Sequence, residues 1–156
     1  MIKYIGIDPG KTGAIAILYG NELLDYTTMM VGGKDLDLRA IARWLILNTE
    51  KSEVVACIES VHAMPGQGVT SMFTFGFVTG AIHGILATLE IPYHLVTPQA
   101  WKKEILAGTA KDKQSAIDHA LRAYPGVNLL ATPKSHVPHS GLADSICISE
   151  FCSRNY

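Results

Sequence analysis

The opening of the chain constrains the fold most, because an apolar, β-prone run ends in a carboxylate and the chain then turns back. Residues 3–7 lead into Asp8, Pro9-Gly10 follows, and a second apolar run begins at Gly13. This pattern is typical of a β-hairpin with an acid at the end of a buried strand, and its glycines let backbone approach a ligand closely. Asp8 has two open interpretations, a turn aspartate or a functional acid, because Asp, Pro and Gly are all common in turns.

Turn signals divide the rest of the chain into alternating strands and helices. The further expected strands are 14–19, 23–29, 54–60 and 91–97. The expected helices begin after the cap Asp37, at Thr70 or Ser71, at Pro98, at a capping box of Thr109 and Asp112, and near Ser140. A three-stranded meander followed by strands that alternate with helices indicates an α/β protein with a mixed sheet.

Composition limits the classes of function. With 156 residues, 48% of them hydrophobic, we expect a single domain over 1–156. The net charge of −1 gives no global positive field, so a polyanionic partner must be met by a local basic patch or by metal ions. Three cysteines without metal-ligand spacing favour a reducing cytoplasm. We expect neither a signal peptide nor an apolar run long enough to span a bilayer.

Two further acids stand in apolar surroundings. Glu59 closes the apolar run 54–58, and Asp144 lies within a helix whose first two turns are nearly all small or apolar. Carboxylates are seldom buried unless they are paired or bind a metal. Glu59 could simply mark where its strand reaches the surface, whereas Asp144 should face a cation or a catalytic cleft.

The three acids together predict more than each does alone. The first strand and strand 54–60 can be neighbours in a sheet covered by helices, which brings Asp8, Glu59 and Asp144 together. Gathered carboxylates repel one another unless divalent cations lie between them, and oxygen ligands favour Mg²⁺ or Mn²⁺ over zinc. Two such ions about 4 Å apart can clamp both oxygens of a phosphoryl displacement.

Two other patterns leave alternatives open. Gly76, Gly80 and Gly84 recur every fourth residue of one expected helix, so either the sheet or the same helix of a second subunit packs closely there. A basic cluster surrounds the helix from Pro98 and the start of the next one. It is either a phosphate site beside a helix N-terminus or a solvated surface. The cluster comprises Lys102, Lys103, Lys111 and Lys113.

The element order and these motifs resemble the ribonuclease H-like fold, and within it the RuvC-type Holliday junction resolvases of a phage or bacterial branch. Residues 6–13 (Gly-Ile-Asp-Pro-Gly-Lys-Thr-Gly) resemble the first motif of that family, Ile58-Glu59 the second, and residues 143–146 its closing helix. Lys102 and Lys113 match the spacing of two basic residues in its third region. The resemblance implies a five-stranded mixed sheet, three strands antiparallel and then parallel, with helices on both faces.

The resemblance also implies an activity. The protein would be a homodimeric, Mg²⁺- or Mn²⁺-dependent endonuclease that cuts four-way DNA junctions and leaves 5′-phosphate ends. Asp8, Glu59 and Asp144 would hold two ions, and Lys113 would act at the scissile phosphate. The implied DNA contacts are Lys11, Lys102, Lys103, Lys111, Lys113, Gln67, Phe73 and Phe75. Whether helicase partners are needed does not follow from the sequence.

One position departs from the family pattern. The family has a fourth ligand, usually Asp or His, three residues before the last aspartate, and here that residue is Gly141. His139 is the nearest substitute and Ser140 a weaker one. His136 and His139 do not predict a zinc site, because no cysteine or third histidine lies nearby.

Three alternatives remain beside the resolvase interpretation. The first hairpin also resembles the phosphate-binding hairpin of sugar kinases and actin-like ATPases, but 156 residues leave no room for their second domain. A nuclease of the same fold could act on another branched DNA or on an RNA–DNA hybrid. A junction-binding protein without catalysis would also explain the glycine at 141.

Overall fold

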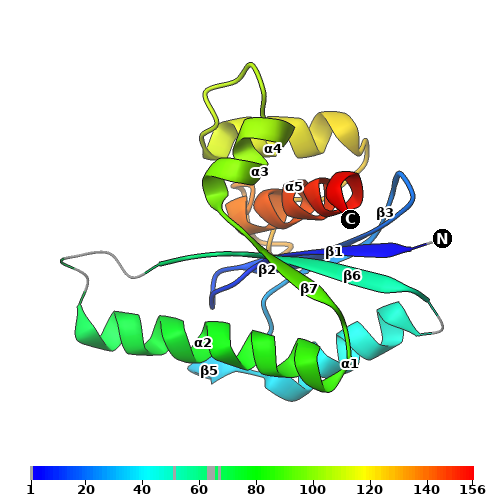
Figure 1. The fold of residues 1–156 in the computed structure, drawn as a ribbon. Helices are drawn as coiled ribbons and strands as arrows, with labels where there is room; N and C mark the ends of the chain where they lie inside the picture. The colour runs from blue at the N-terminus through cyan, green and yellow to red at the C-terminus, as the bar shows by residue number, and fades with distance from the viewer. Residues whose placement is uncertain (1, 51, 63–65, 67) are drawn as a thin grey trace.

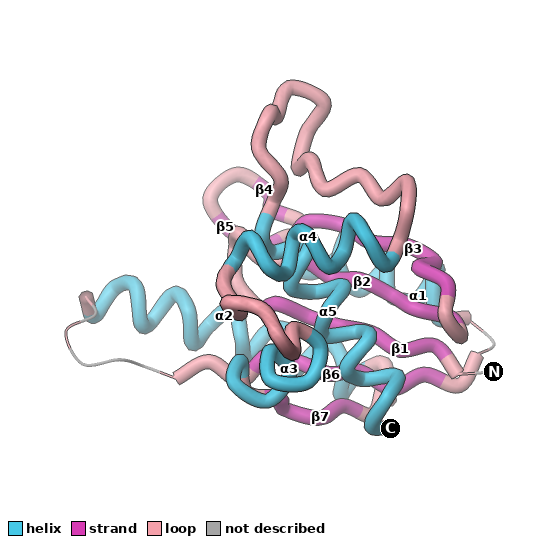
Figure 2. The backbone as a smooth tube through the Cα atoms, turned by 90° about the horizontal axis from the view of Figure 1, so that it is seen from above, coloured by secondary structure: helices cyan, strands magenta, loops and turns pink. Residues whose placement is uncertain are grey.

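A mixed sheet forms the middle layer of the computed structural model, which describes residues 2–50, 52–62, 66 and 68–156 (Figure 1). In the described chain this sheet has five strands in the order β3-β2-β1-β6-β7, seen side by side in Figure 2. The strands are β1 (Lys3–Asp8), β2 (Ala14–Tyr19), β3 (Glu22–Thr28), β6 (Val54–Glu59) and β7 (Tyr93–Val96). β1, β2 and β3 are antiparallel, whereas β6 is parallel to β1 and to β7. The predicted fold class is confirmed.

Helices cover both faces of the sheet (Figure 1). One face carries α3 (Pro98–Ile105), α4 (Lys113–Ala123) and α5 (Ser140–Asn155), and the other carries α1 (Leu38–Thr49) and α2 (Val69–Thr88). The sequence did not predict a small hairpin of β4 (Val31–Gly32) and β5 (Asp35–Leu36), which lies on the α1 and α2 side.

The central strands are apolar on both sides because each side faces a separate core. Ile5, Ile7 and Ile58 are buried under α1 and α2, whereas Cys57 lies in the core under α5. Continuous apolar runs are expected for strands buried on both faces. This burial explains why a carboxylate at the end of β1 or β6 emerges directly from the core.

Helix α5 packs against β1 at backbone contact distance. A Cβ atom at Gly6 would lie 2.1 Å from the Ser145 carbonyl oxygen and 2.2 Å from the Ser149 nitrogen. Only glycine fits there, since those atoms belong to helix backbone. This approach sets the position of α5, and therefore of Asp144, relative to β1.

The structure confirms some of the predicted helix starts and contradicts others. Asp37 caps α1 by accepting from the Ala40 backbone, and Pro98 stands in the first turn of α3 as predicted. The prediction that Thr70 or Ser71 caps α2 is wrong, because α2 begins at Val69 after Gly68 without a side-chain cap bond.

The predicted capping box before α4 is also wrong. Asp112 itself is the N-cap of α4 and accepts a hydrogen bond from the Ser115 backbone. Thr109 instead donates its hydroxyl to the Leu106 carbonyl in the loop after α3. A short carboxylate is a strong cap by itself, so no box is needed.

The glycine stripe of α2 does not face the sheet. Val78, Ile82 and Leu86 are the buried residues of this helix, and a Cβ at Gly76, Gly80 or Gly84 would meet nothing within 4 Å. The interpretation that the sheet packs on the stripe is therefore wrong. Packing by a second subunit stays a prediction.

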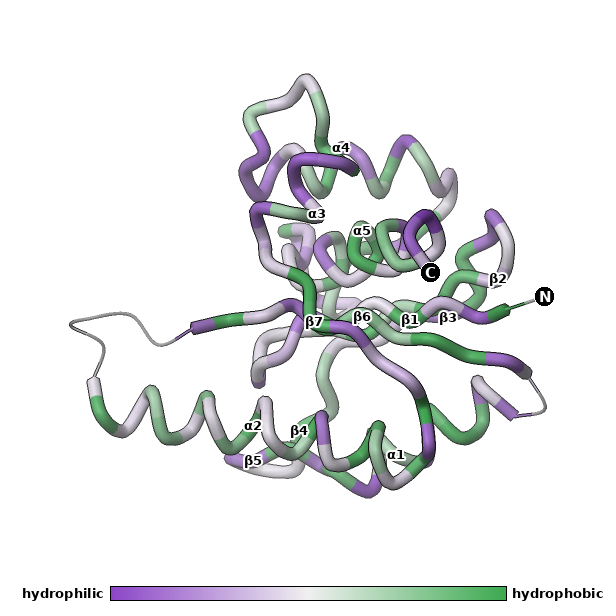
Figure 3. The backbone as a smooth tube through the Cα atoms, viewed as in Figure 1, coloured by the Kyte–Doolittle hydropathy of each residue, from purple (hydrophilic) through white to green (hydrophobic). Residues whose placement is uncertain are grey.

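Helix α2 also corrects the expectation about apolar runs. Its 20 residues, with a mean hydropathy of 1.4, are long and apolar enough to cross a membrane by length and composition. Hydrophobic segments recur along its whole length in Figure 3. Only 17% of this apolar segment is buried. Helix α2 therefore packs one stripe on the sheet and presents apolar side chains on its other faces.

Candidate metal-dependent nuclease site

Two carboxylates emerge at one edge of the sheet because β1 and β6 are parallel neighbours. Asp8 is the last residue of β1 and Glu59 the last of β6, and Ile7 pairs with Ile58 directly before them. Asp144 comes from α5, the helix that packs on β1 at Gly6. The fold thus makes neighbours of the three elements that carry these acids.

The pKa values of Asp8 and Asp144 show that the charges of the three acids act on one another. Burial, followed by the charges of Glu59 and Asp144, raises the pKa of Asp8 to about 8. Burial and then Glu59 raise the pKa of Asp144 to about 6. Carboxylates without a nearby positive charge favour the protonated form in a low-dielectric site. A divalent cation bound among the three acids would reduce the repulsion between their ionised forms.

Two predicted lysines lie close enough to act on the same acids. The positive charges of Lys102 and Lys113 oppose the rise in pKa at both Asp8 and Asp144. Lys102 lies in the last turn of α3 and is half-buried, and Lys113 is the exposed first residue of α4. The structure thus places one cation from each helix beside the carboxylates.

Glu59 has a partner that sequence reasoning missed. The indole Nε1 of Trp101 donates a hydrogen bond to Oε1 of Glu59 at 2.9 Å, and the Trp101 side chain is fully buried. A tryptophan beside two lysines in a short helix was the available signal. It could not reveal Glu59 as the partner, because 42 residues separate the two.

His139 lies at the site as the N-cap of α5. Its Nδ1 accepts a hydrogen bond from the Leu142 backbone at 3.2 Å. A Cβ at Gly141 would be 2.9 Å from Cε1 of His139 and 3.2 Å from Oδ2 of Asp8, so the imidazole and Asp8 flank the space above Gly141. Since Nδ1 accepts, Nε2 of a neutral ring carries the proton, and metal binding through Nε2 would require loss of the cap bond.

The donor set fits a hard divalent cation. As the side chains stand, no three His, Cys, Asp or Glu residues of the described chain form a group that could hold a metal ion. The charges of Glu59 and Asp144 nevertheless raise the pKa of Asp8, and the charge of Glu59 raises that of Asp144, so the three acids lie close enough to interact. Oxygen donors of this kind suit Mg²⁺ or Mn²⁺.

The remaining predicted DNA contacts are spread more widely. Lys11 bonds the Lys34 carbonyl oxygen and forms an ion pair with Asp35 at 3.5 Å, so its charge is already partly matched. Lys103 and Lys111 are exposed near Lys102 and Lys113. Gln67 lies outside the described residues.

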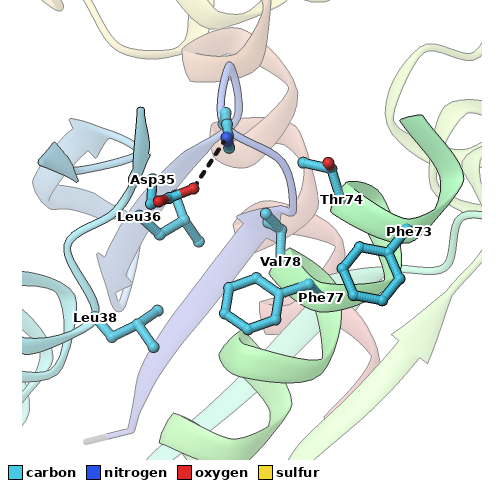
Figure 4. Close-up of a pocket in the computed structure, with 8 residues that line it drawn as sticks. Asp35, Leu36, Leu38, Phe73, Thr74, Phe77 and Val78 are labelled. Carbon is cyan, nitrogen blue, oxygen red and sulfur yellow. Dashed lines mark ion pairs between the residues drawn. The ribbon is translucent and has the colours of Figure 1, made fainter. Parts of the chain in front are cut away.

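Phe73 and Phe75 differ in position. Phe73 is 77% exposed and lines a cavity of about 310 Å³ between α2, Lys11 and the β4–β5 hairpin, whereas Phe75 is half-buried. Figure 4 shows Phe77, which the sequence analysis did not single out, beside Phe73 on the same helix. The cavity is lined by Lys11, Asp35, Leu36, Leu38, Phe73, Thr74, Phe77 and Val78.

Solved structures share this architecture. RuvC from Thermus thermophilus aligns with 97% of this chain and 95% of its own at a TM-score of 0.66 and 17% identity. The Fowlpox virus resolvase, solved with Holliday junction DNA, aligns with 99% of both chains at 0.56 and 16% identity. The yeast mitochondrial resolvase Ydc2 aligns with 99% of this chain and 84% of its own at 0.59 and 14% identity.

This chain has the fold of the RuvC-type Holliday junction resolvases. A second Thermus thermophilus RuvC structure, in complex with a Holliday junction substrate, aligns with 99% of this chain at a TM-score of 0.67 and 15% identity. No protein-family model and no curated protein matches the sequence.

Proposed function

We propose that this protein is a structure-selective endonuclease that hydrolyses phosphodiester bonds in four-way DNA junctions. One observation carries the proposal: Asp8, Glu59 and Asp144 meet at a buried sheet edge in a fold shared with junction resolvases. The activity belongs to DNA recombination and repair, and we propose the cytoplasm of a bacterial or phage-infected cell as its place. A single domain over residues 1–156 is part of the same proposal.

The three carboxylates would hold two Mg²⁺ ions, for which Mn²⁺ can substitute. Such ions supply an activated water and stabilise the leaving oxygen, which gives 5′-phosphate ends. Asp8 and Asp144 must be ionised to bind, and Lys102 and Lys113 favour that form. The same lysines would hold the DNA phosphate in place, a contact that carries no sequence information.

His139 and α2 complete the proposal. The imidazole of His139 lies beside Asp8 and Gly141, where it can bind the second ion after rotation or donate its Nε2 proton to a DNA phosphate. The open glycine stripe of α2 would pack against the same helix of a second copy and form a homodimer that cuts opposed strands. Apolar helices with small residues on one face permit such close packing.

Cleavage of a synthetic four-way junction tests the function. Wild-type protein should nick the junction with Mg²⁺ or Mn²⁺ and leave a matched linear duplex intact. Asp8→Asn should bind the junction and lose at least about 100-fold in cleavage, because it removes a cation ligand and leaves the lysines. Asp118→Asn, an exposed acid on α4, is the matched control and should cleave normally.

Other substrates separate the alternatives. If junction, flap and RNA–DNA hybrid all survive with either ion, the enzyme proposal is wrong and junction binding alone would remain. Faster cleavage of hybrid than of junction would contradict only the choice of substrate. Unchanged cleavage by Asp8→Asn would show that the site lies elsewhere.

A further inference from the structure

Trp101 links helix α3 to the carboxylate site through one hydrogen bond. Its Nε1 donates to Oε1 of Glu59 at 2.9 Å, and the whole side chain is buried. An indole N–H can only donate, so it cannot bind a cation. The bond therefore uses one acceptor position of Oε1 and leaves the second oxygen, Oε2, without this restraint.

The surroundings make this bond rigid. Trp101 belongs to the core that includes Ile105, Leu106 and Ala143, so the indole has no room to rotate away. Helix α3 is fixed at its start by Thr97, whose side chain accepts from the Ala100 backbone. A donor on a rigid element restricts the rotamer of the carboxylate that it holds, as partners of metal ligands commonly do.

The same indole also supports a basic residue of the site. Nζ of Lys102 lies 5.3 Å from the centroid of the Trp101 ring, within the range of a cation–π interaction. Lys102 in turn acts on Asp8 and Asp144. One buried side chain thus interacts with an acid and a base of the candidate site, through its N–H and through its ring.

We propose that Trp101 is a positioning residue: its N–H holds Glu59 in the orientation that presents Oε2 to the cation. The inference rests on the proposed metal-dependent function. It concerns a residue that touches neither DNA nor ion, and it assigns the tryptophan a role beyond filling the core.

Metal binding to the free protein is the first test. Trp101→Phe keeps an aromatic ring and removes the donor, and Mn²⁺ affinity measured by calorimetry without DNA should fall about 10- to 100-fold. Trp44→Phe is the matched control, because it changes the other tryptophan, on α1 in the opposite core, and should leave Mn²⁺ affinity unchanged. Equal Mn²⁺ affinity in wild type and Trp101→Phe would overturn the inference.

Coupling to Glu59 separates positioning from a general loss of packing. If Trp101 acts through Glu59, Trp101→Phe should add little further loss of Mn²⁺ affinity in a Glu59→Gln background. If Trp101→Phe lowers the Mn²⁺ affinity by the same factor in the Glu59→Gln background as in wild type, the inference is overturned. Because this cycle needs no substrate, it gives a result even if the protein cuts no junction.

The NMR signal of the Trp101 indole N–H tests the hydrogen bond in protein whose Trp101 is unchanged. In ¹⁵N-labelled protein with the Trp44→Phe background, one indole signal remains, and it should exchange slowly with water. Glu59→Gln should shift this signal strongly, whereas Glu53→Gln, outside the site and before β6, should not. An indole signal that Glu59→Gln leaves in place would overturn the inference.

Discussion

At the scale of single residues, the site depends on where protons lie. Asp8 has a pKa of about 8 and Asp144 of about 6, both raised first by burial and then by neighbouring acids. Burial and the neighbouring acids therefore favour the protonated form of Asp8 in the free protein near neutral pH. A divalent cation has to displace that proton before Asp8 can bind it.

Metal binding should accordingly release protons. At pH 7, Mg²⁺ binding should release about one proton, most of it from Asp8. The affinity should rise as pH increases through about 8, since the folded-state pKa of Asp8 is raised and ionisation favours binding. Calorimetry in two buffers of different ionisation enthalpy measures the release. Equal apparent enthalpies at pH 7 would contradict it, and Asp8→Asn should remove most of the difference.

His139 combines two roles that matched variants can separate. His139→Asn keeps a good N-cap and removes the imidazole, whereas His139→Ala removes both. We expect both variants to lose metal-dependent cleavage, and only His139→Ala to lose about 1 kcal/mol of unfolding free energy. His136→Ala, an exposed control, should change neither property. Full cleavage by His139→Asn would show that His139 only caps α5.

At the scale of elements, the contact of α5 with β1 determines the site geometry. The sequence predicted both elements from their apolar patterns, with Asp8 at the end of the strand and Asp144 within the helix. It could not predict Gly6 as the contact point, because a glycine in a strand has no partner until the fold supplies one. For the same reason it could not pair Trp101 with Glu59, or show that Gly141 is crowded by Thr12 and His139.

The contact at Gly6 predicts a sharp contrast between two glycine-to-alanine changes. Gly6→Ala should reduce the unfolding free energy by about 3 kcal/mol or more, because the new methyl group overlaps backbone of α5. Gly84→Ala meets open space inside a helix and should stabilise the free subunit by up to about 1 kcal/mol. Denaturant unfolding measures both. A mild effect at Gly6 would mean that α5 can move away from β1.

At the scale of the whole molecule, α2 packs only one stripe, Val78, Ile82 and Leu86, against the rest of the chain. The sequence indicated that something packs closely on Gly76, Gly80 and Gly84, but a single chain does not reveal which partner does so. The structure excludes the sheet, because the buried stripe of α2 is a different one. We propose a second copy as the occupant, because two subunits related by symmetry could present one site to each of two opposed strands of a junction.

A charge on the open stripe tests the homodimer. Gly80→Arg should convert the dimer into a monomer in light scattering, and thermal unfolding of the subunit should change little because a Cβ at that position meets nothing within 4 Å. Asn21→Arg, in the exposed turn between β2 and β3, adds the same charge and should leave the dimer intact. A monomeric wild-type protein would contradict the assignment of α2.

The sequence positions of the three acids also determine when the proposed cation site can assemble during synthesis. Asp8 leaves the ribosome early, Glu59 later, and Asp144 only with α5, which follows every other described element along the chain. Since α5 backbone fills the face of β1 at Gly6, the ligand set cannot assemble before that helix has emerged and docked. A nascent chain that lacks α5 therefore carries only part of the proposed cation-ligand set.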